Sequence, residues 1–190
     1  MNWILASGSP RRRELLEMLG VPNLTIRPAK GPERATPGAG PEQTVRELAL
    51  HKAQEVAQTC APEDIVIAAD TIVYLDGAIL GKPKDTADAA RMLAALSGRE
   101  HTVYTGVAVL RGGETRLAAE HTAVRFRTLT PAEITRYIAT GEPMDKAGAY
   151  GIQGRGALFV AHLDGDYFNV MGLPLCRLGQ LLNELGVELL

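Results

Sequence analysis

The order of apolar and polar residues divides the chain into apolar runs and segments with a helical period. The longest apolar run, residues 65–74, shows no alternation and predicts a strand that is covered on both faces. Asp70 is its only charged residue, and burial of a carboxylate without a partner is costly. Shorter apolar or alternating segments predict the other strands, at residues 4–6, 24–27, 78–81, 102–110, 116–126, 157–163 and 167–170.

Apolar residues that recur every three or four positions predict helices between these strands. The helices are expected at residues 11–19, 42–59, 86–96, 131–139 and 174–185. Two long segments carry neither pattern. Residues 28–41 are rich in glycine, proline and alanine, and a loop of that length is often functional. Residues 145–156 are spaced by glycines, which fits either an ordinary loop or a backbone that runs close to a ligand.

The first turn of the chain, residues 7–9, joins an apolar strand to a helix that begins with Pro10. Proline suits the first helical position, and Ser9 is then the expected N-cap. Three arginines follow at positions 11–13, although each cation at a helix N-terminus opposes the helix dipole by roughly 0.3–1 kcal/mol. A bound phosphate would offset this cost, because it accepts hydrogen bonds from backbone N–H groups and from guanidinium. The alternative is a capped helix with solvated arginines.

Composition narrows the classes of function. The 190 residues are 46% hydrophobic and 22% charged, as in ordinary soluble enzymes, and suffice for one large domain or two small lobes. The formal net charge of −2 argues against a nucleic-acid-binding surface but permits a local cationic pocket. Cys60 and Cys176 lack the spacing of a metal site and suit a reducing cytoplasm. We expect neither a signal peptide nor a membrane span.

Further charged residues accompany the predicted strands. Lys52 lies in a predicted helix, Lys82 and Lys84 follow a predicted strand, and Glu33 lies in the first long loop. Taken singly, these positions fit ordinary solvated side chains. Together with Asp70 and the arginines they fit a polyphosphate and a divalent metal ion, because carboxylate oxygens are hard ligands suited to Mg²⁺ or Mn²⁺. No P-loop or zinc-binding motif competes with this interpretation.

Six sequence blocks stand out: residues 5–12 (LASGSPRR), 69–73 (ADTIV), 81–83 (GKP), 96–98 (LSG), 145–154 (DKAGAYGIQG) and 170–175 (VMGLPL). These blocks resemble the Maf family of nucleoside triphosphate pyrophosphatases. They run the length of the chain in the order of the family. The block at residues 150–154 resembles the branch that acts on dTTP and UTP, rather than the branch that acts on 7-methyl-GTP. Residues 31–34 stand where the family carries an acidic turn and match least well.

The resemblance implies a fold, an activity and site residues. The fold is α/β and ITPase-like: an elongated mixed β-sheet with flanking helices, in which residues 1–190 form one domain of two lobes around a cleft. The activity is hydrolysis of a nucleoside triphosphate, with a divalent metal ion, to the monophosphate and pyrophosphate. The family is cytoplasmic and usually dimerises, so we expect a homodimer and neither nucleic acid nor membrane as a partner. The proton acceptor falls on Asp70, and the specificity positions fall on Arg11, Thr71 and Gln153.

The residues themselves support matching roles. We hypothesise that Asp70 orients or deprotonates the attacking water, and that Asp70 and Glu33 hold Mg²⁺ or Mn²⁺. The phosphates would be neutralised by Ser7, Arg11, Arg12, Lys52 and Lys82.

Gln153 is the candidate for reading the base. Its amide offers a donor and an acceptor, which match N3–H and O4 of uracil or thymine. A flipped amide would match cytosine, so a partner such as Thr71 must fix the orientation. Two other functions stay open: the same chemistry on a modified purine nucleotide such as 7-methyl-GTP, and a non-enzymatic nucleotide-binding regulator of cell division.

Overall fold

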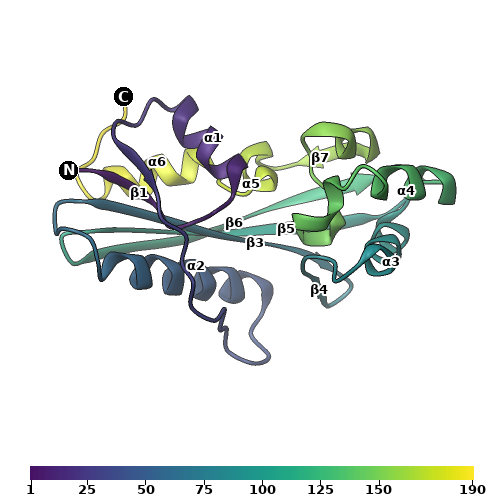
Figure 1. Cartoon of the computed structure of the whole chain (residues 1–190), viewed down its shortest axis with the longest axis horizontal. Coiled ribbons are helices and arrows are strands. Elements are labelled where there is room, and N and C mark those ends of the chain that lie inside the picture. The colour runs from purple at the N-terminus through teal and green to yellow at the C-terminus, as the bar shows by residue number, and fades with distance from the viewer. The chain divides into compact units, whose positions relative to one another are not determined.

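The computed structural model describes residues 1–190 and contains a seven-stranded sheet (Figure 1). The strands are β1 (Trp3–Leu5), β2 (Leu24–Ile26), β3 (Ile65–Leu75), β4 (Ala78–Leu80), β5 (Glu100–Arg111), β6 (Glu114–Phe126) and β7 (Val160–Asp164). Their order is β2-β1-β3-β5-β6-β7, with β4 paired to β3 beside this path. The sheet is mixed, because β1 runs parallel to β2 and β3, whereas β4 and β7 run antiparallel to β3 and β6.

Six helices and three 3₁₀ turns complete the fold. The helices are α1 (Pro10–Met18), α2 (Pro41–Ala57), α3 (Thr86–Leu96), α4 (Pro131–Ile138), α5 (Tyr167–Met171) and α6 (Leu175–Asn183). The turns are η1 (Glu142–Asp145), η2 (Ala147–Ala149) and η3 (Gly154–Phe159). The predicted α/β class with a mixed sheet is confirmed, and all five predicted helices are present. No helix combines the length and apolar character that crossing a bilayer requires.

Of the last two predicted strands, residues 157–163 are correct only from residue 160, because residues 157–159 belong to η3, and residues 167–170 are wrong. Residues 160–164 form β7, which pairs with β6, but residues 167–171 form α5. Asp166 accounts for the difference, because its carboxylate accepts a hydrogen bond from the backbone N–H of Phe168 at 2.7 Å. This is the bond of an N-terminal helix cap, and it overrides the strand preference of the aromatic residues that follow.

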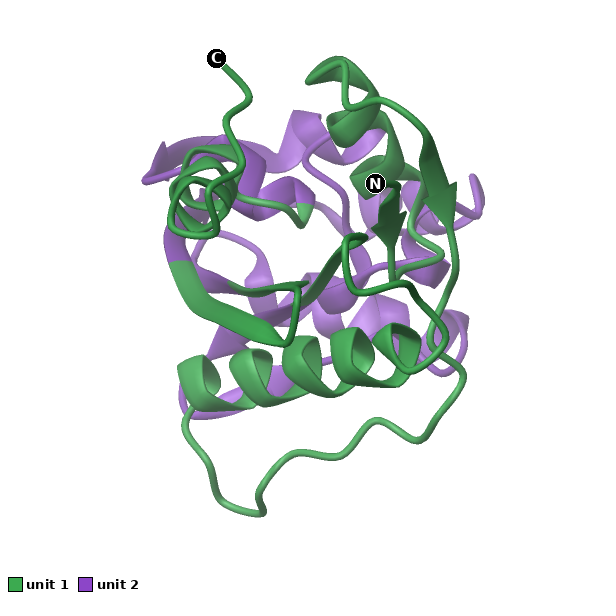
Figure 2. Cartoon of the chain, turned by 90° about the vertical axis from the view of Figure 1, so that its left-hand side faces the viewer, with its two compact units in different colours: residues 1–70, 105–120, 172–190 green, residues 71–104, 121–171 purple.

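The chain forms two compact units, which Figure 2 shows in different colours. Unit 1 consists of residues 1–70, 105–120 and 172–190, and unit 2 of residues 71–104 and 121–171. In unit 1, α2 covers one face of the strands, and α1 and α6 lie on the other face (Figures 1 and 2). α2 approaches β5 closely at Gly106, where a Cβ atom would lie 2.2 Å from the carbonyl oxygen of Val45. The glycine therefore lets α2 sit directly on the strand.

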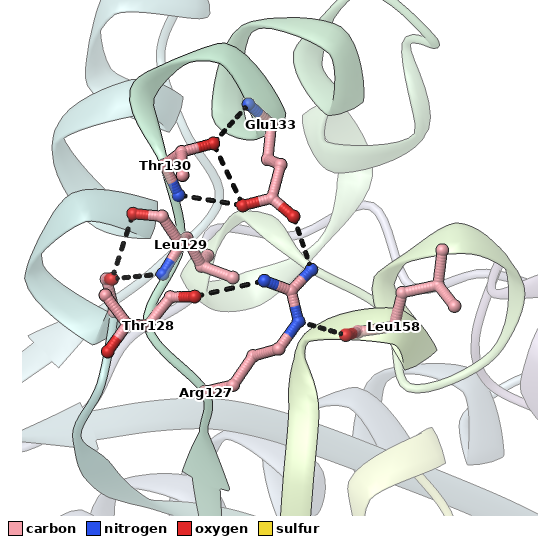
Figure 3. Close-up of polar contacts among 7 residues, drawn as sticks. Arg127, Thr128, Leu129, Thr130, Glu133 and Leu158 are labelled. Carbon is pink, nitrogen blue, oxygen red and sulfur yellow. Dashed lines mark hydrogen bonds and ion pairs between the residues drawn. The ribbon is translucent and has the colours of Figure 1, made fainter.

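In unit 2, the helices α3 and α4 pack against each other over a core of aliphatic and aromatic side chains. α4 begins with a capping box, in which the Thr130 side chain accepts from Glu133 N at 3.3 Å and the Glu133 carboxylate accepts from Thr130 N at 2.8 Å (Figure 3). The Arg127 guanidinium donates to the same carboxylate at 2.7 Å. This hydrogen bond is the main reason why the pKa of Glu133 falls to about 2.

Candidate functional site

The turn after β1 holds Ser7 and Arg12 together. Ser7 is only 8% exposed, and its hydroxyl oxygen accepts hydrogen bonds from the backbone N–H of Ser9 at 3.2 Å and from Arg12 Nη1 at 3.0 Å. Arg12 Nε donates to the carbonyl oxygen of Gly172 at 2.7 Å. Ser9 occupies the N-cap position of α1 as predicted, but its side chain makes no capping hydrogen bond. The turn instead uses the hydroxyl group of Ser7 to orient the guanidinium of Arg12.

The arginines of the first helical turn lie in different environments. Arg13 is exposed and pairs with a glutamate of its own helix at 2.7 Å. Arg12 is half-buried, and this burial lowers its pKa, whereas the charges of Asp70 and Glu33 raise it and the charge of Arg11 lowers it. Arg12 therefore lies within the electrostatic field of both candidate carboxylates and of the neighbouring arginine.

Lys52, on α2, joins the two candidate carboxylates. Its Nζ donates a hydrogen bond to Asp70 Oδ1 and lies 2.7 Å from Glu33 Oε1. The side chains of Lys52 and Asp70 are 18% and 11% exposed, whereas that of Glu33 is 64% exposed. The charge in the apolar strand β3 is thus paired, as the cost of its burial requires. Lys52 was one of the cations predicted for the phosphates, but its pairing with Asp70 and Glu33 was not predicted.

The loop that carries Glu33 is fastened to α2 at two further points. The carboxylate of Glu55 accepts hydrogen bonds from the backbone N–H groups of residues 30–31 at 2.7 and 2.9 Å. The carboxylate of Glu47 accepts from the backbone N–H and the hydroxyl of Thr36 at 2.7 and 3.0 Å. These bonds fix the loop before and after Glu33.

The other predicted site residues belong to unit 2. Thr71 lies in β3 and is half-buried, and Lys82 is exposed in the segment after β4. Gln153 is half-buried and precedes η3 in an extended conformation. The carbonyl oxygen of Gly81 accepts a hydrogen bond from the backbone N–H of Gly148 at 3.0 Å, so the segment before Lys82 contacts the glycine-rich segment.

The predicted metal ligands can be tested on their geometry. Glu33 and Asp70 converge on one cationic nitrogen, so they already stabilise positive charge at one point. The structure contains no group of three or more His, Cys, Asp or Glu side chains that could hold a metal ion. Mg²⁺ is commonly held by one or two carboxylates while substrate phosphates supply further oxygens. The two carboxylates therefore fit a divalent cation that binds together with a phosphate.

Several contacts of the site were missed from the sequence. Glu47 and Glu55 were not singled out, because their loop partners lie 11 to 25 positions away in the sequence and leave no local signal. Gly172 belongs to a block that carries the family resemblance, but its carbonyl contact with Arg12 spans 160 positions and left no local signal.

Comparison with known proteins identifies the family. Residues 2–185 match the family described as Maf-like protein. A dTTP/UTP pyrophosphatase of Moorella thermoacetica is 55% identical over 187 residues, 97% of this chain and 95% of that protein. A second, of Symbiobacterium thermophilum, is 52% identical over 96% of this chain and 93% of that protein. The solved structure of the Staphylococcus aureus Ham1 protein is similar over 66% of this chain and 72% of that chain, with 16% identity and a TM-score of 0.48. As its six sequence blocks predict, the chain belongs to the family of Maf-like proteins.

Proposed function

We propose that this protein hydrolyses dTTP and UTP to the nucleoside monophosphate and pyrophosphate. Relatives of similar length and about half identical sequence are named dTTP/UTP pyrophosphatases, which supports the choice of substrate. The observation that carries the proposal lies in unit 1, where Arg12 is oriented by Ser7 and the strand carboxylate Asp70 is paired with Lys52. Hydrolysis of a phosphoanhydride needs both elements: cations for the phosphates and an acid–base group for the water.

The phosphates are assigned first to Arg12. Hydrogen bonds to Ser7 and Gly172 fix the plane of its guanidinium, and a planar guanidinium suits the oxygens of a phosphate. Its partial burial strengthens its attraction for an anion, because less water screens the charge. Lys52, Arg11 and Lys82 are proposed to neutralise the remaining charge.

The water is assigned to Asp70. Lys52 donates a hydrogen bond to Oδ1 of this carboxylate, which restricts the rotation of the carboxylate group. A carboxylate oriented in this way can accept a proton from a water molecule within hydrogen-bond distance. Glu33 and Asp70 would hold Mg²⁺ or Mn²⁺, which when bound would supply positive charge to the phosphates.

The choice of base is assigned to Gln153, with Thr71 as the group that fixes its amide. We propose in addition that the protein acts in the cytoplasm, which the two unpaired thiols of Cys60 and Cys176 support. A homodimer also remains a proposal, and sedimentation of the purified protein tests it.

The substrate is tested by pyrophosphate release from dTTP, UTP, CTP, dUTP, GTP and 7-methyl-GTP, each with Mg²⁺, Mn²⁺ or a chelator. We expect dTTP and UTP to be preferred and the chelator to abolish turnover. Preference for 7-methyl-GTP would instead support the purine alternative. Nucleotide binding without pyrophosphate release would contradict the proposal and support a non-enzymatic regulator.

A further inference from the structure

The backbone on both sides of Gln153 is held by one carboxylate and one phenol. The carboxylate of Glu142 accepts hydrogen bonds from the backbone N–H groups of residues 155 and 156, at 3.0 and 3.1 Å. The hydroxyl of Tyr137 donates to the same carboxylate at 2.9 Å and accepts from the backbone N–H of Gly151 at 3.3 Å. Tyr137 and Glu142 therefore hydrogen-bond the backbone two residues before Gln153 and two to three residues after it.

The protonation states suit these bonds. Burial raises the pKa of Glu142, but the hydrogen bonds from the two backbone N–H groups and from Tyr137, together with the charge of Lys146, hold the pKa below its usual range. Burial, and then the bond to Glu142, raises the pKa of Tyr137, so the phenol keeps the proton that it donates. The charged carboxylate makes the three hydrogen bonds that Glu142 accepts stronger than neutral pairs would be.

The glycines of this segment make room for the same two side chains. A Cβ atom at Gly156 would lie 2.7 Å from the Tyr137 hydroxyl oxygen and 2.2 Å from the carbonyl oxygen of Gly151. A Cβ atom at Gly154, where φ is +71°, would lie 2.9 Å from Glu142 Oε2. The glycine spacing thus serves packing within unit 2, whereas the sequence left open a backbone that runs close to a ligand.

We propose that Tyr137 and Glu142 are positioning residues that hold Gln153 in place for base selection, an inference that rests on the proposed function. Discrimination by an amide requires that the donor and acceptor be held to within about 0.5 Å. The hydrogen bonds at residues 151, 155 and 156 fix the backbone on both sides of Gln153. The side chain of Gln153 then reaches a base from one fixed backbone position. We assign Tyr137 and Glu142 to the backbone around Gln153 and not to a contact with the base.

The test uses two substitutions that keep the size of the side chain. Glu142→Gln removes the charge and leaves one oxygen where two accepted, and Tyr137→Phe removes the bond to Gly151. For each variant, we expect the ratio of kcat/KM for UTP to that for CTP to fall at least about threefold, the effect of one ordinary hydrogen bond. KM for UTP should rise more than kcat falls, since the reacting groups are unchanged.

Asp64→Asn is the matched control. Its carboxylate also accepts two backbone N–H hydrogen bonds, from Asn2 at 2.8 Å and Ala61 at 3.1 Å, but it lies in unit 1 and outside the candidate site. Loss of this carboxylate should lower the free energy of unfolding without changing the ratio of kcat/KM for UTP to that for CTP. Gln153→Ala is the reference for complete loss of positioning, and adding Glu142→Gln to it should lower the ratio no further, because coupled residues are not additive.

Hydrogen exchange supplies a measurement that does not depend on activity. In Glu142→Gln, the backbone N–H groups of residues 151, 155 and 156 should exchange faster than in the unaltered protein. Faster exchange with an unchanged ratio in both variants would overturn the proposal and leave the proposed function intact. An unchanged ratio in Gln153→Ala would overturn both this proposal and the role of Gln153, whereas a chain without pyrophosphate release would contradict the proposed function itself.

Discussion

Two loops of this protein look alike in sequence and differ in the way they are held. Residues 28–40 in unit 1 and residues 145–156 in unit 2 are both rich in glycine and lack a regular apolar period. The first loop is mostly exposed and is fastened by charged side chains of α2. The second contains buried residues and contributes Ala149 and Tyr150 to the core of unit 2.

The difference matches the proposed roles of the two loops. Glu33 would have to move when a metal ion and a phosphate arrive, and a loop held by a few surface contacts can open at low free-energy cost. Gln153 would have to discriminate between bases, and a packed loop opens only together with its unit. The contacts of residues 28–40 therefore let Glu33 change its position, whereas the packing of residues 145–156 keeps Gln153 in one position.

A matched pair of glycine substitutions, one in each loop, should show the largest difference between the two loops. Gly156→Ala places a Cβ atom 2.2 Å from a backbone oxygen that cannot move away, so we expect a loss of about 3 kcal/mol of unfolding free energy. Gly31→Ala places a Cβ atom 2.6 Å from Glu55 Oε2, the end of a flexible side chain, so we expect a loss of only about 0.5 kcal/mol of unfolding free energy. Urea denaturation measures both, and equal losses would contradict the distinction.

Acid should affect the packed loop first. His101 hydrogen-bonds the buried Tyr150, and burial lowers the pKa of His101 to about 4. As the pH falls below about 6.5, the unfolded chain binds a proton that the folded chain does not, so folding stability decreases by about 2 kcal/mol near pH 5. The pKa of Glu47 is lowered, mainly by the hydrogen bond from the Thr36 N–H. The contact of Glu47 with the first loop is therefore lost only as the pH falls below about 4.5.

Urea midpoints between neutral pH and pH 5 test this order. His101→Gln should remove the decrease in stability between neutral pH and pH 5, because glutamine does not bind a proton in either the folded or the unfolded chain. The backbone N–H groups of residues 150–156 should lose protection in this range before those of residues 30–36. A decrease that persists in His101→Gln would show that another group causes it.

The tethered loop should respond most to the loss of Glu33 itself. Glu33→Gln removes a contact of Lys52 and a proposed metal ligand, so kcat/KM for UTP should fall about tenfold, or ~1.4 kcal/mol. Glu55→Gln weakens only the tether and should cost about threefold, the effect of one hydrogen bond. Titration with Mg²⁺ separates them, since only Glu33→Gln should raise the concentration needed for half-maximal activity. A larger effect of Glu55→Gln would show that the tether, not Glu33, is what matters.

The sequence predicted what depends on neighbours along the chain. The helices have a clear local period, the long strands are apolar or alternating runs, and Asp70 is visible as one charge in such a run. α5 was missed because its start depends on Asp166, whose backbone is in turn held by Thr122 of β6, 44 positions away.

Contacts between distant residues account for most of what was missed in the site. Lys52 was a candidate, and its spacing to Leu48 and Val56 places it on the apolar side of α2, but its pairing with a carboxylate 18 positions away was not predicted. Glu33 entered the candidate site through the chemistry of metal ligands alone, since its own surroundings in the sequence predict an exposed side chain and match the family least well. Glu142 has partners 13 and 14 positions away and was not singled out.

The central claim is that Asp70 acts on the water while the neighbouring cations hold the triphosphate. Its most direct test is the rate of pyrophosphate release from UTP by Asp70→Asn, with Asp64→Asn as the control for loss of a carboxylate in the same unit. Asp70→Asn keeps the shape of the side chain but removes the base, so kcat should fall at least about 10²-fold while Asp64→Asn stays near the unaltered protein. A folded Asp70→Asn protein that turns over UTP at a normal rate would contradict the account.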